Sequence, residues 1–240
     1  MKFRNSVTAV FTSCNRPDLL FKTLNSFFIY NSYQISKLII VEDGLRPLNF
    51  LHSYPFQIPA TIIATGKKVG QIAAIDYAYS FVDTEYIFHV EDDWEFYNSG
   101  FIEKSIRLLK QEDECIQVWL RALNDINGHP LEERIERCTN IFKSTFEWRK
   151  LKYDYLGVWH GFSFNPGLRR MSDYVDTKGY GIHFINQNCK IEEKGSGESA
   201  ISIHYRSKNK FAAILADNNG LGYVKHIGWG RTVIDPLKGN

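Results

Sequence analysis

A short apolar stretch that ends in three consecutive acids is the feature that most limits how this chain can fold. Residues 86–96 read YIFHVEDDWEF. The aromatic and β-branched residues within 86–90 are too few for a helix and indicate a buried strand. Ligands of an open α/β sheet bind outside the carboxyl ends of its strands, and Glu91, Asp92 and Asp93 fall at that position. The stretch therefore predicts a binding site at one edge of a sheet.

Three neighbouring carboxylates repel one another, and near a core they need a compensating cation or hydrogen-bond donors. A divalent metal supplies that charge. Mg²⁺ is usually held by one or two carboxylates together with substrate phosphates, and Mn²⁺ also prefers oxygen ligands. The alternative is a solvated acidic turn without a ligand, and the rest of the chain has to decide between the two.

Short apolar strands alternate with amphipathic helices along the first half of the chain. Strands are predicted at 7–11, 38–41, 61–64, 86–90 and 116–120. Helices are predicted after Pro17, over 72–82 and over 101–109. This alternation predicts an α/β protein with a mostly parallel central sheet flanked by helices. No repeat or linker interrupts the 240 residues, so a single domain is expected, with a nucleotide-binding half at 1–96.

Several local details follow from turn and cap chemistry. Asn15 is expected to cap the helix after Pro17, and Asn98 or Ser99 to cap the helix over 101–109. The segments 211–216 and 223–227 flank Asn218-Asn219-Gly220, which predicts a β-hairpin. Residues 124–152 show a weak pattern, which indicates irregular structure or an excursion from the main fold.

Composition restricts the partners. The chain has 29 Lys and Arg against 27 Asp and Glu, which predicts no nucleic acid partner. Cys14, Cys115, Cys138 and Cys189 form no C-x-x-C pair, so no zinc ribbon is indicated and free thiols in a reducing cytosol are expected. No segment has the roughly 18 apolar residues of a membrane helix. We expect a soluble, cytoplasmic protein, with peripheral membrane association left open.

Four motifs taken together resemble a known family. They read VTAVFTSCNRP, LIIVEDG, GKKVGQIAAIDYA and YIFHVEDDW, in that order. The series is similar to nucleotide-sugar glycosyltransferases of the GT-A fold, both to glycosyltransferase family 2 and to N-acetylglucosaminyltransferases whose D-x-D motif is E-D-D. The likeness covers residues 6–96 well and the remainder loosely. It implies an acceptor-binding half at 97–240.

The resemblance implies a donor site in the first half of the chain. Thr12 and Arg16 resemble the positions that line the base and meet the diphosphate. Asp43 resembles the acid that accepts a hydrogen bond from uracil or another base, although an acid before glycine is also ordinary turn chemistry. Lys68 and Gln71 fall where the family contacts the nucleotide or the donor sugar.

The same resemblance assigns roles within the acidic motif. Asp93 resembles the metal ligand, Asp92 lies near the ribose and Glu91 near the donor sugar. His226 resembles the C-terminal histidine that completes the metal site in some of these enzymes. The metal, Mn²⁺ or Mg²⁺, neutralises charge on the departing nucleoside diphosphate.

An inverting transferase also needs a base that takes the proton of the acceptor hydroxyl. Glu198, in GSGESAISI, fits best, because family 2 enzymes place an acid at the start of a late helix. The competing acids are Glu193 and Asp173. The residues expected to line the acceptor pocket, or else to belong to the core, are Trp159, His160 and Phe162.

The implied function is a metal-dependent, inverting transfer of a hexose or N-acetylhexosamine from a nucleoside diphosphate sugar, UDP-sugars first, to a glycan or other hydroxyl acceptor. Two alternatives stay open. One is a non-catalytic nucleotide- or glycan-binding module on a degenerate transferase fold. The other is a sugar nucleotidyltransferase, which would normally carry a glycine-rich basic loop where this chain has TSCNRP.

Overall fold

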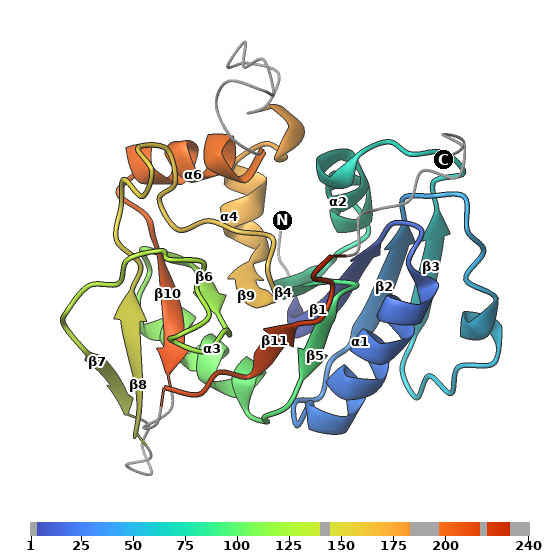
Figure 1. The fold of residues 1–240 in the computed structure, drawn as a ribbon, viewed down its shortest axis with the longest axis horizontal. Helices are drawn as coiled ribbons and strands as arrows, with labels where there is room; N and C mark the ends of the chain where they lie inside the picture. The colour runs from blue at the N-terminus through green and yellow to red at the C-terminus, as the bar shows by residue number, and fades with distance from the viewer. Residues whose placement is uncertain (1–3, 140–144, 183–196, 217–219, 231–240) are drawn as a thin grey trace.

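One mixed sheet organises the molecule. The structure is a computed structural model, and it describes residues 4–139, 145–182, 197–216 and 220–230. Within these ranges, nine strands form a sheet in the order β3-β2-β1-β4-β9-β6-β10-β8-β7, with helices on both of its faces (Figure 1). The α/β class with a mostly parallel central sheet is therefore confirmed.

The parallel part of the sheet contains the strands predicted from the sequence. They are β1 (Arg4–Ser13), β2 (Lys37–Glu42), β3 (Ala60–Ala64), β4 (Thr84–Glu91), β6 (Cys115–Trp119) and β10 (Phe211–Ala216). The antiparallel strands are β7 (Glu136–Thr139), β8 (Thr145–Lys150) and β9 (Gly167–Arg170). A separate two-stranded ribbon among the described residues pairs β5 (Trp94–Phe96) with β11 (Val224–His226).

The helices divide between the two faces according to their apolar residues. One face is covered by α1 (Pro17–Tyr30) and α3 (Phe101–Gln111). The other face is covered by α2 (Gln71–Tyr79), α4 (Met171–Asp176) and α6 (Gly197–Ser207). No helix within the described ranges is long and apolar enough to span a membrane.

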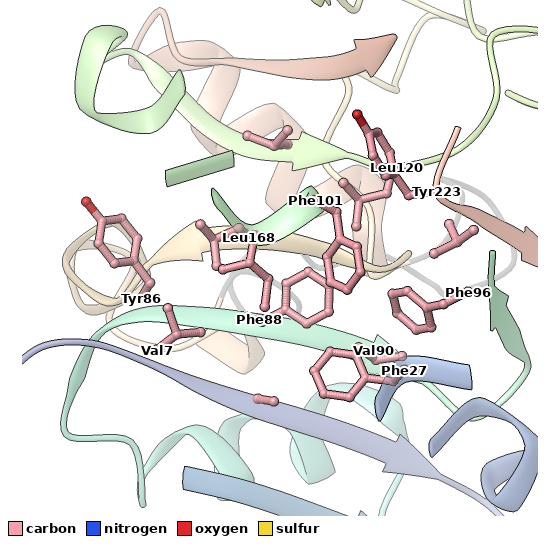
Figure 2. Close-up of a cluster of buried hydrophobic side chains, with 14 of the residues drawn as sticks. Val7, Phe27, Tyr86, Phe88, Val90, Phe96, Phe101, Leu120, Leu168 and Tyr223 are labelled. Carbon is pink, nitrogen blue, oxygen red and sulfur yellow. The ribbon is translucent and has the colours of Figure 1, made fainter. Parts of the chain in front are cut away.

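The larger part of the core lies on the face of α1 and α3, and Figure 2 shows part of it around Phe27, Phe88 and Phe101. The ring of Phe27 on α1 lies 5.7 Å from that of Phe88 on β4 and 5.4 Å from that of Phe96 on β5. Phe101 of α3 lies 5.2 Å from Phe88. These rings, edge-on or tilted in most pairs, pack β4, β5 and two helices around the end of one strand, so the turn after β4 rests on a tightly packed base.

Strand β9 explains why the middle of the sheet is not parallel. It pairs antiparallel with both β4 and β6, so it separates the two parallel halves. Gly167 begins it, and a Cβ there would lie 2.4 Å from the carbonyl oxygen of Val118. Only glycine allows this close approach of two backbones.

Two local predictions are wrong, and a third holds in one of its two forms. The segments 211–216 and 223–227 do not form a hairpin, because β10 pairs with β6 and β8 whereas β11 pairs with β5. Gly100, not Asn98 or Ser99, occupies the N-cap of α3, without a side-chain cap. Within 124–152, β7 and β8 form an antiparallel pair, which agrees with an excursion, one of the two structures indicated for this stretch.

Candidate functional site

The predicted acids lie at the carboxyl edge of the sheet. Glu91 is the last residue of β4, and Asp92 and Asp93 form the turn into β5. Thr23 of α1 holds this turn from below: its hydroxyl donates to the carbonyl of Asp92 (2.7 Å) and accepts from the amide of Trp94 (3.2 Å). Sequence reasoning missed Thr23, although a threonine on the buried face of a helix calls for a polar partner.

Arg16 compensates the charge of two of the acids. Its Nε lies 3.2 Å from Asp92 Oδ2, its Nη1 lies 2.8 Å from Asp93 Oδ2, and its Nη2 donates to Asp92 Oδ1. The amide of Cys14 also donates to Asp92 Oδ2, at 3.3 Å. Both aspartates are buried, and this bidentate contact supplies the donors that buried carboxylates need.

The three acids have different protonation equilibria. Burial, together with the nearby charges of Asp93 and Glu198, raises the pKa of Glu91 to about 8. Burial also raises the pKa of Asp92, against the opposing effect of Arg16. For Asp93 burial acts in the same direction, but His226 and Arg16 outweigh it and hold the pKa below its ordinary value. Asp93 is therefore the most readily ionised acid of the three.

A pocket of about 330 Å³ opens beside this turn. It contains all the residues that the sequence assigned to nucleotide-sugar binding, together with three that it did not assign, Ser13, Cys14 and Ala74. The assigned residues that line it are Thr12, Arg16, Asp43, Lys68, Gln71, Glu91 and Asp92. They come from the carboxyl ends of β1, β2 and β4 and from the start of α2, so the topology of the sheet brings them together.

Asp43 fixes one wall of the pocket. Its carboxylate accepts from the backbone amides of Val69 (2.6 Å) and Gly70 (2.9 Å). Gly70 has a φ of +96°, a left-handed conformation that favours glycine. Gln71 follows, and its side chain donates to Glu91 Oε1 at 2.8 Å. The loop that carries Lys68 is thus tied to both β2 and β4.

Asn15 has a different role from the one expected. The N-cap of α1 is Arg16, without a side-chain cap. Asn15 instead has a φ of +59°, and its side-chain oxygen accepts from the amides of Leu45 (2.9 Å) and Arg46 (3.0 Å). The backbone amide of Asn15 donates to Glu42 Oε1 at 2.6 Å. Asn15 therefore joins the loops after β1 and β2, and the predicted cap is wrong.

His226 reaches the acidic turn through the small ribbon. Because His226 lies opposite Trp94 in the pairing of β11 with β5, its Nε2 comes within 3.2 Å of Asp93 Oδ2. The rings of Trp94 and Trp229 lie 5.1 and 4.7 Å from the imidazole. The part of the chain that the structure describes contains no group of three or more His, Cys, Asp and Glu side chains placed to hold a metal. Asp93 and His226 form a pair.

Glu198 lies in the first turn of α6. Its Oε1 accepts from the Ser163 hydroxyl (3.0 Å) and from the Phe164 amide (2.5 Å). It is close enough to raise the pKa of Glu91. The structure thus brings the expected base next to the acid assigned to the donor sugar.

The remaining acceptor-side candidates are placed elsewhere. Asp173 forms an ion pair of 2.9 Å with Arg170. Arg170 lies opposite Tyr86 in the register of β9 with β4, near the start of β4. This is the edge of the sheet opposite Glu91, so the structure does not bring Asp173 to the acidic turn. Glu193 lies outside the described residues. His160 and Phe162 are buried, so they belong to the core behind the site, whereas Trp159 is half-buried.

Comparison with known folds agrees with this geometry. At 11% identity, a mannosyltransferase from Pyrobaculum calidifontis, solved with GDP-Man and Mn²⁺, superposes with a TM-score of 0.61 over 97% of this chain and 59% of its own. GalNAc-T7, solved with UDP, GalNAc and Mn²⁺, gives 0.64 at 9% identity over 98% of this chain and 46% of its own. Residues 1–349 of TarS from S. aureus give 0.57 at 12% identity over 91% of this chain and 59% of theirs.

This chain thus spans 46 to 59% of the length of these structures. Because the identities are low, the structural likeness establishes the GT-A fold and nothing more. No curated protein sequence matches it significantly. The profile of glycosyl transferase family 2, however, matches residues 8–173, which is more than half of the chain. The chain is therefore a member of glycosyl transferase family 2 with a GT-A fold.

Proposed function

We propose that this protein transfers a sugar from a nucleoside diphosphate sugar to a hydroxyl acceptor. The observation that carries the proposal is the convergence of Thr12, Arg16, Asp43, Lys68 and Gln71 on one pocket beside the acidic turn. These side chains come from separate loops and offer cations, hydrogen-bond donors and an acceptor, which is the chemistry that a base, a ribose and a diphosphate require.

The proposed donor site uses the two ends of the pocket differently. Asp43, held by the loop amides, accepts from the base, and Arg16 and Lys68 face the diphosphate. Asp92 lies near the ribose and Glu91 near the sugar. UDP is the first candidate nucleotide, since solved relatives of the fold carry UDP in TarS and in GalNAc-T7, while GDP-Man in the mannosyltransferase keeps guanine donors in the test.

The proposal includes a divalent metal, Mn²⁺ or Mg²⁺, held by Asp93 and His226. The pair fits such an ion: Asp93 is the readily ionised acid, and His226 Nε2 faces its carboxylate at 3.2 Å. A carboxylate and an imidazole suit Mn²⁺, and the diphosphate supplies further oxygens. When bound, the metal stabilises the negative charge of the leaving diphosphate.

On the acceptor side, Glu198 takes the proton of the attacking hydroxyl. Its proximity to Glu91, the acid proposed to lie near the sugar, supports this role. The acceptor oxygen attacks the anomeric carbon from the face opposite the diphosphate, which inverts that centre. Residues 1–96 would then bind the donor and residues 97–240 the acceptor, within a single domain. Of the three residues considered for the acceptor pocket, Trp159 is half-buried whereas His160 and Phe162 are buried, so Trp159 is the candidate for contact with an acceptor sugar.

Release of the nucleoside diphosphate tests this function. The purified protein is incubated with UDP-sugars and GDP-Man, with Mn²⁺ and with a mixture of sugar and glycan acceptors. We expect release of one nucleoside diphosphate that rises with acceptor concentration. Tight nucleotide binding without release over the whole acceptor mixture would contradict transfer and would favour a non-catalytic nucleotide- or glycan-binding module.

A further inference from the structure

Ser163 lies between the core and Glu198, and its backbone is held by a buried side chain. The side-chain amide of Gln117 donates to the Ser163 carbonyl (2.7 Å), and the Ser163 amide donates back to Gln117 Oε1 (3.0 Å). Arg169 Nη2 adds a third contact, at 3.2 Å from the same carbonyl. Ser163 is 1% exposed and Gln117 is fully buried.

Gln117 stands where an apolar residue would be expected. It lies in β6, all of whose residues are buried, between β9 and β10. A buried amide costs free energy unless its donors and acceptor are satisfied. Here the Ser163 backbone satisfies both ends of the amide, so the glutamine holds the 163–165 segment against the buried strand β6.

The 163–165 segment in turn forms hydrogen bonds to Glu198. The Ser163 hydroxyl donates to Glu198 Oε1 (3.0 Å) and accepts from the Asn165 amide (3.1 Å), and the Phe164 amide donates to the same Oε1 (2.5 Å). Two donors on one oxygen of a carboxylate fix its orientation, and hydrogen bonds to an ionised group are stronger than neutral ones.

We propose that Ser163 and Gln117 are positioning residues that orient Glu198 as the base for the acceptor. The inference rests on the proposed function. In that step the O–H bond of the acceptor breaks and its proton goes to Glu198. The acceptor oxygen then bonds to the anomeric carbon as the bond from that carbon to the diphosphate oxygen breaks, and the nucleoside diphosphate leaves with the electron pair.

Ser163→Ala removes one of the two donors to Glu198 and leaves the backbone in place. We expect kcat to fall about tenfold, as for the loss of one hydrogen bond to a charged group, with the KM for the donor within about twofold of wild type. The acid limb of the pH–rate profile should move up by about one pH unit, because an ionised carboxylate that loses a donor is protonated more readily.

Ser202→Ala is the matched control. Ser202 lies on α6, the helix that also carries Glu198. Its hydroxyl accepts from the backbone amides of His160 (2.7 Å) and Phe162 (3.4 Å). Its hydroxyl anchors the same loop through these two contacts, neither of which involves Glu198. We expect this variant to lose thermal stability to a similar degree and to keep the acid limb of wild type. Gln117→Leu, which releases the Ser163 backbone, should lower kcat without weakening nucleotide binding.

Glu198→Gln separates the possible failures. If wild type transfers sugar, Glu198→Gln is inactive, and Ser163→Ala keeps the kcat and the acid limb of wild type, the positioning role is overturned while the proposed function stands. If Glu198→Gln transfers sugar as wild type does, the base assignment falls and this inference falls with it. If wild type itself releases no nucleotide, the proposed function is overturned first. Nucleotide binding and thermal unfolding establish that each variant is folded.

Discussion

Arg16 and Asp93 are joined by an ion pair of 2.8 Å at the carboxyl edge of the sheet, and the same guanidinium also binds Asp92. One side chain of the first loop therefore supplies charge to two of the three acids that follow β4. The acidic turn is folded around an internal cation, and a metal bound there would add to this charge.

The first prediction concerns this ion pair. Arg16→Ala leaves buried carboxylates without their main donor, so the free energy of unfolding should fall by about 3 kcal/mol. Urea denaturation measures the change. Arg134→Ala is the control, because the Arg134 side chain is 82% exposed and pairs only with Glu136 among the described residues. The control should change stability by less than about 0.5 kcal/mol. Equal effects in the two variants would contradict a structural role for Arg16.

The second prediction concerns the proposed metal pair. Asp93→Asn removes the charge of the readily ionised acid while keeping its shape, so Mn²⁺ affinity in the presence of nucleotide should fall at least tenfold. The electron paramagnetic resonance signal of free Mn²⁺ measures the bound fraction. Asp83→Asn is the matched control, because Asp83 precedes β4 at the opposite edge, and it should bind Mn²⁺ as wild type does. Unchanged Mn²⁺ affinity in Asp93→Asn would remove the metal assignment.

The third prediction concerns the base. Glu198→Gln keeps an oxygen for the Ser163 hydroxyl and the Phe164 amide but accepts no proton. Transfer should fall at least about a hundredfold, while the dissociation constant for the nucleoside diphosphate stays within about twofold. Steady-state rates and equilibrium titration separate the two effects. Full turnover in this variant would exclude Glu198 as the base.

The fourth prediction concerns acid stability. Burial, and secondarily the charge of Arg169, lower the pKa of His89 well below its ordinary value of 6.5. Below pH 6.5 the unfolded chain therefore binds a proton at His89 that the folded chain does not bind. Stability should fall as the pH falls, with His89 contributing up to about 1.4 kcal/mol per pH unit.

Urea denaturation from about two pH units below to about one pH unit above the ordinary histidine pKa of 6.5 would measure that slope. His89→Gln should flatten it by the contribution of His89, since glutamine does not titrate. His52→Gln, which replaces an exposed histidine, should keep the wild-type slope. A variant of His89 with the same slope as wild type would show that another group causes the acid sensitivity.

The donor side was predictable from the sequence because its signals are local. The strand pattern before Glu91 fixes β4, and the polar residues after β1 and β2 fall at the same edge once the strands are parallel. Thr12, Asp43 and Glu91 therefore meet in one pocket. Local patterns did not predict the contacts between loops. The ion pairs of Arg16 with the two aspartates, and the hydrogen bonds of Asn15 to the loop after β2, depend on distances set by the whole sheet.

The second half was less predictable because its strands pair over long separations. Strand β9 has four residues and begins at Gly167, so neither length nor alternation marks it as the central antiparallel strand. The hairpin predicted around Gly220 failed for a related reason. Turn chemistry gave a local pairing, whereas β10 and β11 each find partners more than sixty residues away along the chain.

Calorimetric titration with nucleoside diphosphates, first with Mn²⁺ and then with EDTA, tests the central claim most directly. The account predicts that one nucleoside diphosphate, UDP before GDP, binds in Mn²⁺ and that its affinity falls sharply in EDTA. Absence of binding to every nucleotide in both conditions would contradict the account, because the pocket beside Asp92 would then not be a donor site.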